Sequence, residues 1–285
     1  MRSVGHRLIF EGMFGLAQIP IALTALQALL SAQFLVELDF SRANGAFPGP
    51  MLSLICELDR VRDLHAIHVV LPHEAKFRRL FLNANWATLI DPRAGHQSGI
   101  SFNKHMPATR FETTGQQQAV LNRALDILLT SVRSLRRADF SALEWALGEV
   151  MDNVLTHSQS RAGGLVQVST LASRVQFVVC DSGLSIPTTL REAYPTVRDD
   201  AAALGLAIEE GVTRDKSVGQ GNGLFGTFGI CQASEGQLHI RSGRGNLHFT
   251  PNGGLHAVTE NCQLNGVHRA LAWVAGYRFR PPQWK

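Results

Sequence analysis

The chain has 285 residues, which is enough for about two domains that each bury a core of their own. A hydrophobic content of 45% and a charged content of 18% are those of a folded globular protein. The formal net charge of +4 is too small to single out nucleic acid as a partner, so nucleic-acid binding is not indicated.

Cysteine spacing excludes a zinc ribbon and a C-x-x-C redox centre, because the four cysteines lie far apart: Cys56, Cys180, Cys231 and Cys262. A chain of this size needs no disulfides, and unpaired cysteines indicate the reducing cytoplasm. Residues 12–36 carry no charge, but polar residues and Pro20 interrupt them, so we expect no membrane span.

Alternating patterns predict a small α/β domain over residues 1–95. In chain order the expected elements are a helix over 16–32, a strand FLVELDF at 34–40, a turn NGAFPGP at 44–50, a helix over 51–64, a strand AIHVVL at 66–71, a helix over 76–86 and a short strand ATLIDP at 87–92.

A linker is predicted over residues 96–115, which are largely polar and show no clear periodicity. The second domain then covers residues 116–285 and begins with a helix over 116–135. For the next helix, Ser141 and Glu144 form a capping box that predicts its start. Its buried stripe follows at helical spacing: Leu143, Leu147, Val150 and Val154.

A second stripe on the same helix is polar and consists of Glu149, Asn153 and His157. Taken alone, such a stripe is typical of a helix face exposed to water. Further along, the chain predicts a hairpin of strands at 165–171 and 174–180, a helix over 199–211, the glycine-rich segment GQGNGLFG at 219–226, and more strands from QLHIRS at 237 onward.

Two short segments carry signals for ligand binding. Asp181 follows an apolar strand directly, where α/β folds bind ligands, and Gly183 allows a tight turn, although a plain turn explains both. The glycines of GQGNGLFG lead into a helix and can present backbone N–H groups to phosphates, although a flexible linker explains them as well. The Rossmann fingerprint is not met, because no strand precedes GNGLFG.

The order of three motifs resembles the GHKL superfamily of ATP-binding domains, which includes gyrase, Hsp90, histidine kinases and MutL. The motifs are E-x-x-x-N in GEVMDNVLTH, D-x-G-x-x-I-P in CDSGLSIP and G-x-G-x-G-L in GQGNGLFG, within residues 115–275. The resemblance implies an α/β sandwich in which helices cover one face of a mixed sheet, and it implies that the domain binds ATP and Mg²⁺.

Carried over to this sequence, the resemblance implies that Asn153 binds Mg²⁺ and that Glu149 is the general base. Asp181 would accept a hydrogen bond from the adenine amino group. The remaining nucleotide-binding residues would be Gly183, Ile186, Gly219, Gly221, Gly223 and Leu224. A lid over residues 188–222 would close on the phosphates, with Arg214 or Lys216 reaching them.

The pattern E-x-x-x-N-x-x-x-H is most similar to that of the anti-sigma serine kinases, and His157 is expected to be a supporting residue. The C-terminal segment NGVHRALAWV lacks the G-T pair that often closes the GHKL pattern, so no contact is carried over there.

The N-terminal domain resembles the STAS-like fold of anti-sigma antagonists through FLVELDFSRANGAFPGPMLSLICELDRVRDLHAIHVVLP. In that family a serine after a central strand is phosphorylated, but the matching segment VVLPHEAKFRRL contains no serine or threonine. This departure favours a structural or docking role.

Together these patterns predict a cytoplasmic Mg·ATP-binding ATPase that acts as a nucleotide-dependent switch for binding a protein partner or for forming a homodimer. Two alternatives stay open: a protein serine/threonine kinase of the anti-sigma partner-switching type, and a nucleotide-sensing scaffold that does not hydrolyse ATP.

Overall fold

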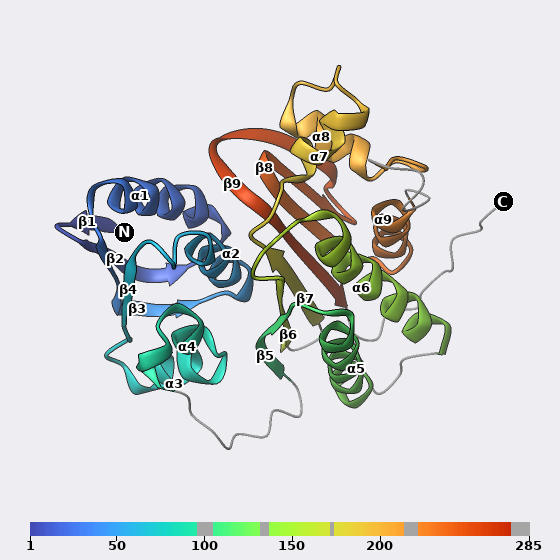
Figure 1. Ribbon diagram of the computed structural model, residues 1–285. Coiled ribbons are helices and arrows are strands. Elements are labelled where there is room, and N and C mark those ends of the chain that lie inside the picture. The colour runs from blue at the N-terminus through green and yellow to red at the C-terminus, as the bar shows by residue number, and fades with distance from the viewer. Residues whose placement is uncertain (96–104, 132–136, 172–173, 214–221, 275–285) are drawn as a thin grey trace. The chain divides into compact units, whose positions relative to one another are not determined.

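The chain folds as a mixed α/β protein, as its sequence predicts (Figure 1). The computed structural model describes residues 1–95, 105–131, 137–171, 174–213 and 222–274. It divides into two compact units, which we call the N-terminal unit (Met1–Phe102 with Pro107–Thr109) and the C-terminal unit (Asn103–Met106 with Arg110–Lys285).

The N-terminal unit contains a four-stranded sheet in the order β1-β2-β3-β4. Its strands are β1 (Arg2–Val4), β2 (Arg7–Phe14), β3 (Leu35–Ala46) and β4 (Ala66–Val70). β1 and β2 form an antiparallel hairpin, whereas β2, β3 and β4 run parallel. The carboxyl ends of these three strands therefore lie at one edge of the sheet.

Helices connect and cover these strands. They are η1 (Leu16–Gln18), α1 (Ile19–Ala32), α2 (Pro48–Asp59), α3 (Ala75–Asn83), α4 (Trp86–Ile90) and η2 (Pro92–Ala94). Part of the core is a row of aromatic rings: Phe10 stacks on Phe40 at 4.1 Å, and Phe40 lies 4.9 Å from Phe81. Trp86 meets Phe81 edge-on at 5.4 Å, so the row joins the sheet to α3 and α4.

Three expectations for this unit were incomplete or wrong. ATLIDP does not form a strand: Asn85 has a left-handed φ of 64° and starts helix α4, which places Trp86 and Ile90 in the core. The expected turn at 44–50 is shorter, because β3 continues to Ala46. Strands β1 and β2 were not predicted.

No helix in the part of the chain that the structure describes is long and apolar enough to cross a membrane.

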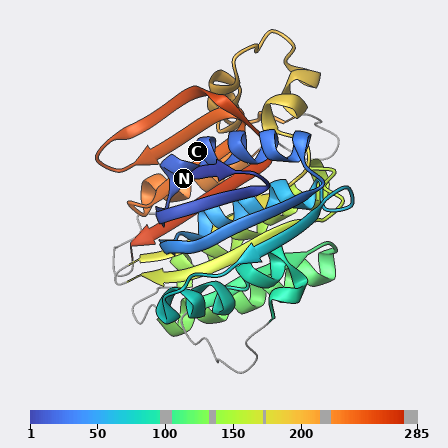
Figure 2. The same ribbon diagram turned by 90° about the vertical axis from the view of Figure 1, so that its left-hand side faces the viewer.

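The C-terminal unit contains a five-stranded sheet in the order β5-β6-β7-β9-β8. Its strands are β5 (His105–Phe111), β6 (Gly164–Leu171), β7 (Arg174–Asp181), β8 (Gln237–Thr250) and β9 (Gly254–Val274). Neighbouring strands from β6 to β8 pair antiparallel. Beyond a break in register near Gly243, β8 and β9 continue as a two-stranded ribbon that curves away from the sheet (Figures 1 and 2).

Helices of this unit are α5 (Thr114–Ser131), α6 (Arg137–His157), α7 (Ile186–Ala193), α8 (Asp200–Ala207) and α9 (Gly223–Ala233). Figure 1 shows α5, α6 and α9 on the same side of the sheet, and their apolar residues share one core with it. Part of the segment predicted as a linker is a strand instead. Residues 105–111 form β5, in which Met106, Ala108 and Phe111 are buried.

Candidate nucleotide site on helix α6

Helix α6 carries the polar stripe that the sequence singles out. Its opposite side is anchored in the core, because the predicted apolar stripe is buried: Leu143, Leu147, Val150 and Val154. Glu149, Asn153 and His157 follow one another at intervals of four and are each half-buried. They therefore belong neither to the core nor to a fully solvated face. Side chains that bind a ligand need such a partly buried environment.

The predicted start of this helix is wrong. α6 begins at Arg137, so Ser141 lies inside the helix and does not cap it. Leu143 and Ala146 are buried, and Asp139 in the first turn is buried as well. In the turn before Ser141, Asp139 is buried and Phe140 packs on the core, whereas Arg137 and Ala138 are exposed. The capping preference of Ser141, worth about 1 kcal/mol, does not set the start of the helix.

Glu149 lies against the first residue of α9. A Cβ atom added to Gly223 would be 2.4 Å from Oε2 of Glu149 and 3.5 Å from its Cδ. Only glycine leaves room for the carboxylate there. The sequence motifs E-x-x-x-N and G-x-G-x-G-L, more than sixty residues apart, thus meet at one point, where the first backbone N–H groups of α9 begin.

The surroundings of Glu149 favour its protonated form. Partial burial, followed by the negative charge of Asp152, raises the pKa of the Glu149 carboxyl above its usual value. A raised pKa makes a carboxylate a stronger base, which suits a group that accepts a proton from water or a hydroxyl.

Asn153 lies one turn further along α6. Its Nδ2 atom is buried and has no hydrogen-bond partner among the described residues. Buried amide groups are nearly always hydrogen-bonded, so an unpartnered carboxamide beside Glu149 indicates a place for an external ligand. Within the described residues, no three His, Cys, Asp or Glu side chains gather to hold a metal ion.

Asp181 and Gly183 lie at the other end of α6. A Cβ at Gly183 would be 1.9 Å from the carbonyl oxygen of Ser158, the residue after α6. That carbonyl accepts a hydrogen bond from the Leu184 N–H at 2.5 Å. Asp181, only 2% exposed, accepts a hydrogen bond from the Gly183 N–H at 2.9 Å. The D-x-G turn is thereby closed onto the end of the helix.

Two further residues of the predicted site have structural surroundings that fix them. Ile186 is the buried first residue of α7, and its N–H donates to Oγ of Ser242 on β8 at 2.8 Å. Leu224, next to Gly223, is partly buried and packs on the core of the unit. His157 ends α6 and is half-buried.

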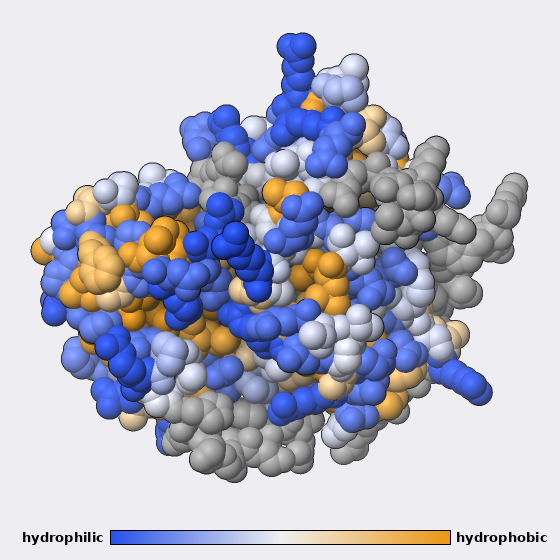
Figure 3. Space-filling model, in the orientation of Figure 1, coloured by the Kyte–Doolittle hydropathy of each residue, from blue (hydrophilic) through white to orange (hydrophobic). Residues whose placement is uncertain are grey.

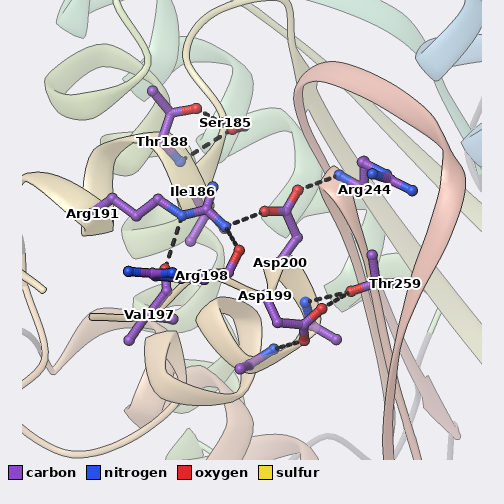
Figure 4. A network of polar contacts seen from close by, with 12 residues as sticks. Ser185, Ile186, Thr188, Arg191, Val197, Arg198, Asp199, Asp200, Arg244 and Thr259 are labelled. Atoms are coloured by element: carbon purple, nitrogen blue, oxygen red, sulfur yellow. Dashed lines mark hydrogen bonds and ion pairs between the residues drawn. The ribbon is translucent and has the colours of Figure 1, made fainter. Parts of the chain in front are cut away.

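The predicted lid over residues 188–222 begins within α7 and contains α8, which packs on β8 with Leu204 fully buried. Its role as a lid stays a prediction. Figure 4 shows the polar contacts that hold these helices: Asp200 pairs with Arg191 at 2.5 Å and accepts the Arg244 N–H at 2.7 Å.

A second contact of this kind comes from Asp199, which caps α8 and accepts a hydrogen bond from Thr259 of β9 at 2.5 Å (Figure 4). This contact, together with a second hydrogen bond from the Ala202 N–H, lowers the pKa of the Asp199 carboxyl. The α7–α8 segment is thus fastened to the β8–β9 ribbon.

Several predicted residues lie outside the described part of the chain: Gly219, Gly221, Arg214 and Lys216. Their roles stay predictions.

The structure also adds residues that the sequence analysis did not single out. Trp145 lies one turn before Glu149, and a Cβ at Gly226 would be 2.3 Å from its ring, so α9 crosses α6 closely at two glycines. Gln117 of α5 donates a hydrogen bond to Asp152 at 2.6 Å. The spacing of Gly223 and Gly226, equal to nearly one helical turn, was the available signal for this close packing.

Comparisons with known proteins add little to this picture. No protein-family model matches the chain, and no curated protein is significantly similar to it. Among solved structures, the chain is similar to that described as the crystal structure of full-length ShkA in complex with AMPPNP, with a TM-score of 0.33 and 15% sequence identity. The match covers 80% of this chain and 43% of ShkA, so the chain corresponds to less than half of that protein's length. A likeness at this level carries no functional conclusion, which has to come from the site residues.

Proposed function

We propose that the C-terminal unit is a GHKL-type domain that binds Mg·ATP and hydrolyses it. One observation carries the proposal. Glu149 on α6 lies against Gly223 of the glycine-rich motif, and Ser158, the residue after α6, lies against Gly183 of the D-x-G motif. These contacts are nine residues apart, or about 14 Å along the helix axis. That separation is comparable to the length of an extended nucleoside triphosphate, with Asn153 between the two ends.

At the Glu149 end the chain offers groups suited to phosphates. The first N–H groups of α9 point toward the start of the helix, where the helix dipole favours an anion. Glu149 beside them would accept a proton from the attacking water, and its raised pKa favours that transfer. Gly223 keeps this carboxylate close to the phosphate end.

Asn153 would hold the metal ion. A carboxamide oxygen is a suitable hard ligand for Mg²⁺, which commonly takes only one or two protein ligands and completes its shell with phosphate oxygens and water. The Asn153 atom without a partner is the donor Nδ2, which does not bind a metal but can donate to a phosphate oxygen while the carboxamide oxygen faces the ion. When bound, Mg²⁺ would neutralise charge on the phosphates.

At the other end, the D-x-G turn would hold the base. Asp181 is fixed by the Gly183 N–H, so its carboxylate is already oriented for a hydrogen bond to an amino group such as that of adenine. Gly183 leaves no room for a side chain, and this brings the turn close against α6.

For the whole chain we propose a cytoplasmic switch with a STAS-like domain over residues 1–95, a connection over 96–115 and a GHKL domain over 116–285. Nucleotide-dependent closure of the predicted lid over residues 188–222 would control binding of a protein partner or formation of a homodimer. The N-terminal domain would serve in docking.

Nucleotide titration and turnover of three proteins test the proposal. The wild type should bind Mg·ATP and release phosphate. Asn153→Ala should lose Mg-dependent binding, while Glu149→Gln should keep binding and lose turnover by about 100-fold, the usual contribution of a general base. Glu144→Gln, five residues earlier on the same helix and on a different side of it, is the matched control and should behave as the wild type.

The products of γ-labelled ATP separate the alternatives. Free phosphate supports an ATPase, and label on a protein hydroxyl supports a kinase that uses the same pocket. Tight binding without either product supports a nucleotide-sensing scaffold. Absence of any Mg·ATP binding by the wild type would overturn the proposal.

A further inference from the structure

We propose that the N-terminal unit carries a docking surface for an acidic, apolar peptide segment of another protein, at the sheet edge where β2 and β3 end. The inference does not depend on nucleotide binding. Among the described residues, most of the large apolar side chains that are exposed belong to this unit. Figure 3 shows apolar side chains gathered on it, at the left of the view. Apolar residues exposed as a group, unlike single ones, mark interaction sites.

Met13 and Phe77 converge above a glycine at this edge. Met13 of β2 pairs with Gly45 of β3, and Gly45 has a φ of 149°. A Cβ at Gly45 would lie 2.8 Å from Cε of Met13 and 3.7 Å from the ring of Phe77. Met13 is nevertheless 47% exposed. A flexible thioether on an aromatic ring is an adaptable contact for another protein.

Phe47 extends the same edge. It directly follows β3, and its N–H donates to the carbonyl of Phe14 at 3.1 Å, so it lies beside the end of β2. Its ring is 48% exposed and passes 3.8 Å from the Cβ position of Gly15. Leu80 lies one turn beyond Phe77 on α3 and is exposed as well.

We call Met13, Phe47, Phe77 and Leu80 the carboxyl-edge patch. It lies at the carboxyl ends of parallel strands, where α/β proteins most often bind their ligands.

Positive charge borders the patch and indicates what binds there. Lys76 and Arg79 are exposed on α3, each next to a patch residue in sequence. Nζ of Lys76 lies 5.4 Å from the ring centre of Phe77. Neither cation forms an ion pair with a described residue, so both are available for carboxylates of a partner. Large apolar side chains with carboxylates between them complement such a surface.

A peptide fits this surface better than a nucleic acid does. Single-stranded nucleic acids bind through bases stacked on aromatic rings, with cations along the backbone. Met13 and Leu80 provide no flat ring, and they occupy a large part of the exposed area.

Two experiments test the inference. Random peptides are first selected for binding to the full-length chain. The enriched peptides are then labelled with a fluorophore, and their affinity is measured by fluorescence polarisation. Enriched sequences should combine Asp or Glu with Leu, Ile, Phe or Trp. Phe47→Ser, and separately Lys76→Glu with Arg79→Glu, should each weaken their binding by about tenfold or more, as expected for central contacts of an interface. Because these side chains are exposed, the variants should unfold at the same denaturant concentration as the wild type.

Matched controls change exposed side chains elsewhere on the chain. Phe34→Ser takes an apolar side chain from the amino end of β3, and Arg123→Glu reverses a charge on α5; both should leave peptide binding within about twofold of the wild type. The inference is overturned if nothing is enriched, if enriched peptides lack acidic residues, or if Phe47→Ser binds them normally. A labelled oligouridine that binds tightly and is unaffected by Phe47→Ser would assign the surface to nucleic acid instead.

Discussion

Substitution of Gly223 by alanine tests the contact between α6 and α9. The new Cβ would lie 2.4 Å from Oε2 of Glu149, about 1 Å inside ordinary van der Waals contact, whereas the remaining Glu149 atoms near it are at 3.5 Å or more. The atom that has to move is the tip of a flexible side chain, whose terminal torsion is soft. The carboxylate should therefore swing away while both helices stay in place.

Opposite effects on stability and activity follow from this geometry. Gly223 does not have a positive φ, so alanine at this helix start should stabilise the fold by up to about 1 kcal/mol. A displacement of 1 Å at a reacting group can cost about 100-fold in rate. We expect a loss in kcat of about 10- to 100-fold, with nearly unchanged affinity for ATP.

Steady-state ATP hydrolysis and urea unfolding measure the two effects. Gly205→Ala in α8 is the matched control, because no atom lies within 4 Å of the added Cβ: it should gain similar stability and keep full activity. The double variant Gly223→Ala with Glu149→Gln should be no slower than Glu149→Gln alone, since both act through one carboxylate.

Wild-type turnover of Gly223→Ala would show that the position of the Glu149 carboxylate does not matter for hydrolysis. Destabilisation of the fold by the 1–3 kcal/mol typical of overpacking would show that the backbone, and not the carboxylate, has to move.

Three further predictions concern the ends of the site and its electrostatics. Gly183→Ala should destabilise the protein by about 3 kcal/mol in urea unfolding and abolish nucleotide binding, because the clash is with the backbone oxygen of Ser158. Asp152→Asn should move the acidic limb of the kcat–pH profile to lower pH: the like charge that raises the pKa of Glu149 is removed, so its base form persists at lower pH. Asp200→Ala should cost about 1–3 kcal/mol of stability, since it removes the ion pair and backbone hydrogen bond in Figure 4.

Each of these predictions has an outcome that contradicts it. A Gly183→Ala protein with wild-type stability would mean that the turn is not closed onto α6. An unshifted pH profile for Asp152→Asn would show that Glu149 does not set the acidic limb. Wild-type stability of Asp200→Ala would show that α7 and α8 are held by apolar packing alone.

Local patterns in the sequence were sufficient for several elements. The apolar spacing of Leu143 to Val154 predicted the buried face of α6, and the two alternating runs around residue 172 predicted the β6–β7 hairpin. The helix expected over 16–32 is present as α1 from Ile19 to Ala32, with Pro20 in its first turn, where proline is tolerated. In each case the sequence pattern that predicts the element lies within the element itself. The element can therefore be predicted without knowing which other elements pack on it.

Other features depended on partners distant in the sequence. Ser141 has good capping chemistry, yet α6 starts at Arg137, and Asp139 and Phe140 in the turn before Ser141 pack within the unit. Residues 105–111 have no strong strand pattern and form β5 only because the sheet edge accepts them. The start of the expected lid is fastened to the β8–β9 ribbon by contacts of Asp199 and Asp200, which no local pattern indicates.

Local sequence patterns were enough to indicate which residues are expected to carry the chemistry: a carboxylate and a carboxamide four residues apart on a helix, an aspartate at a strand end and a glycine-rich helix start. Tertiary structure decided how they meet. Gly223 reaches Glu149, and Gly183 reaches Ser158, only because the sheet and the α6–α9 packing bring their backbones within van der Waals contact. Helical spacing is a local property of the chain, whereas such close approaches depend on the packing of elements that are far apart in the sequence.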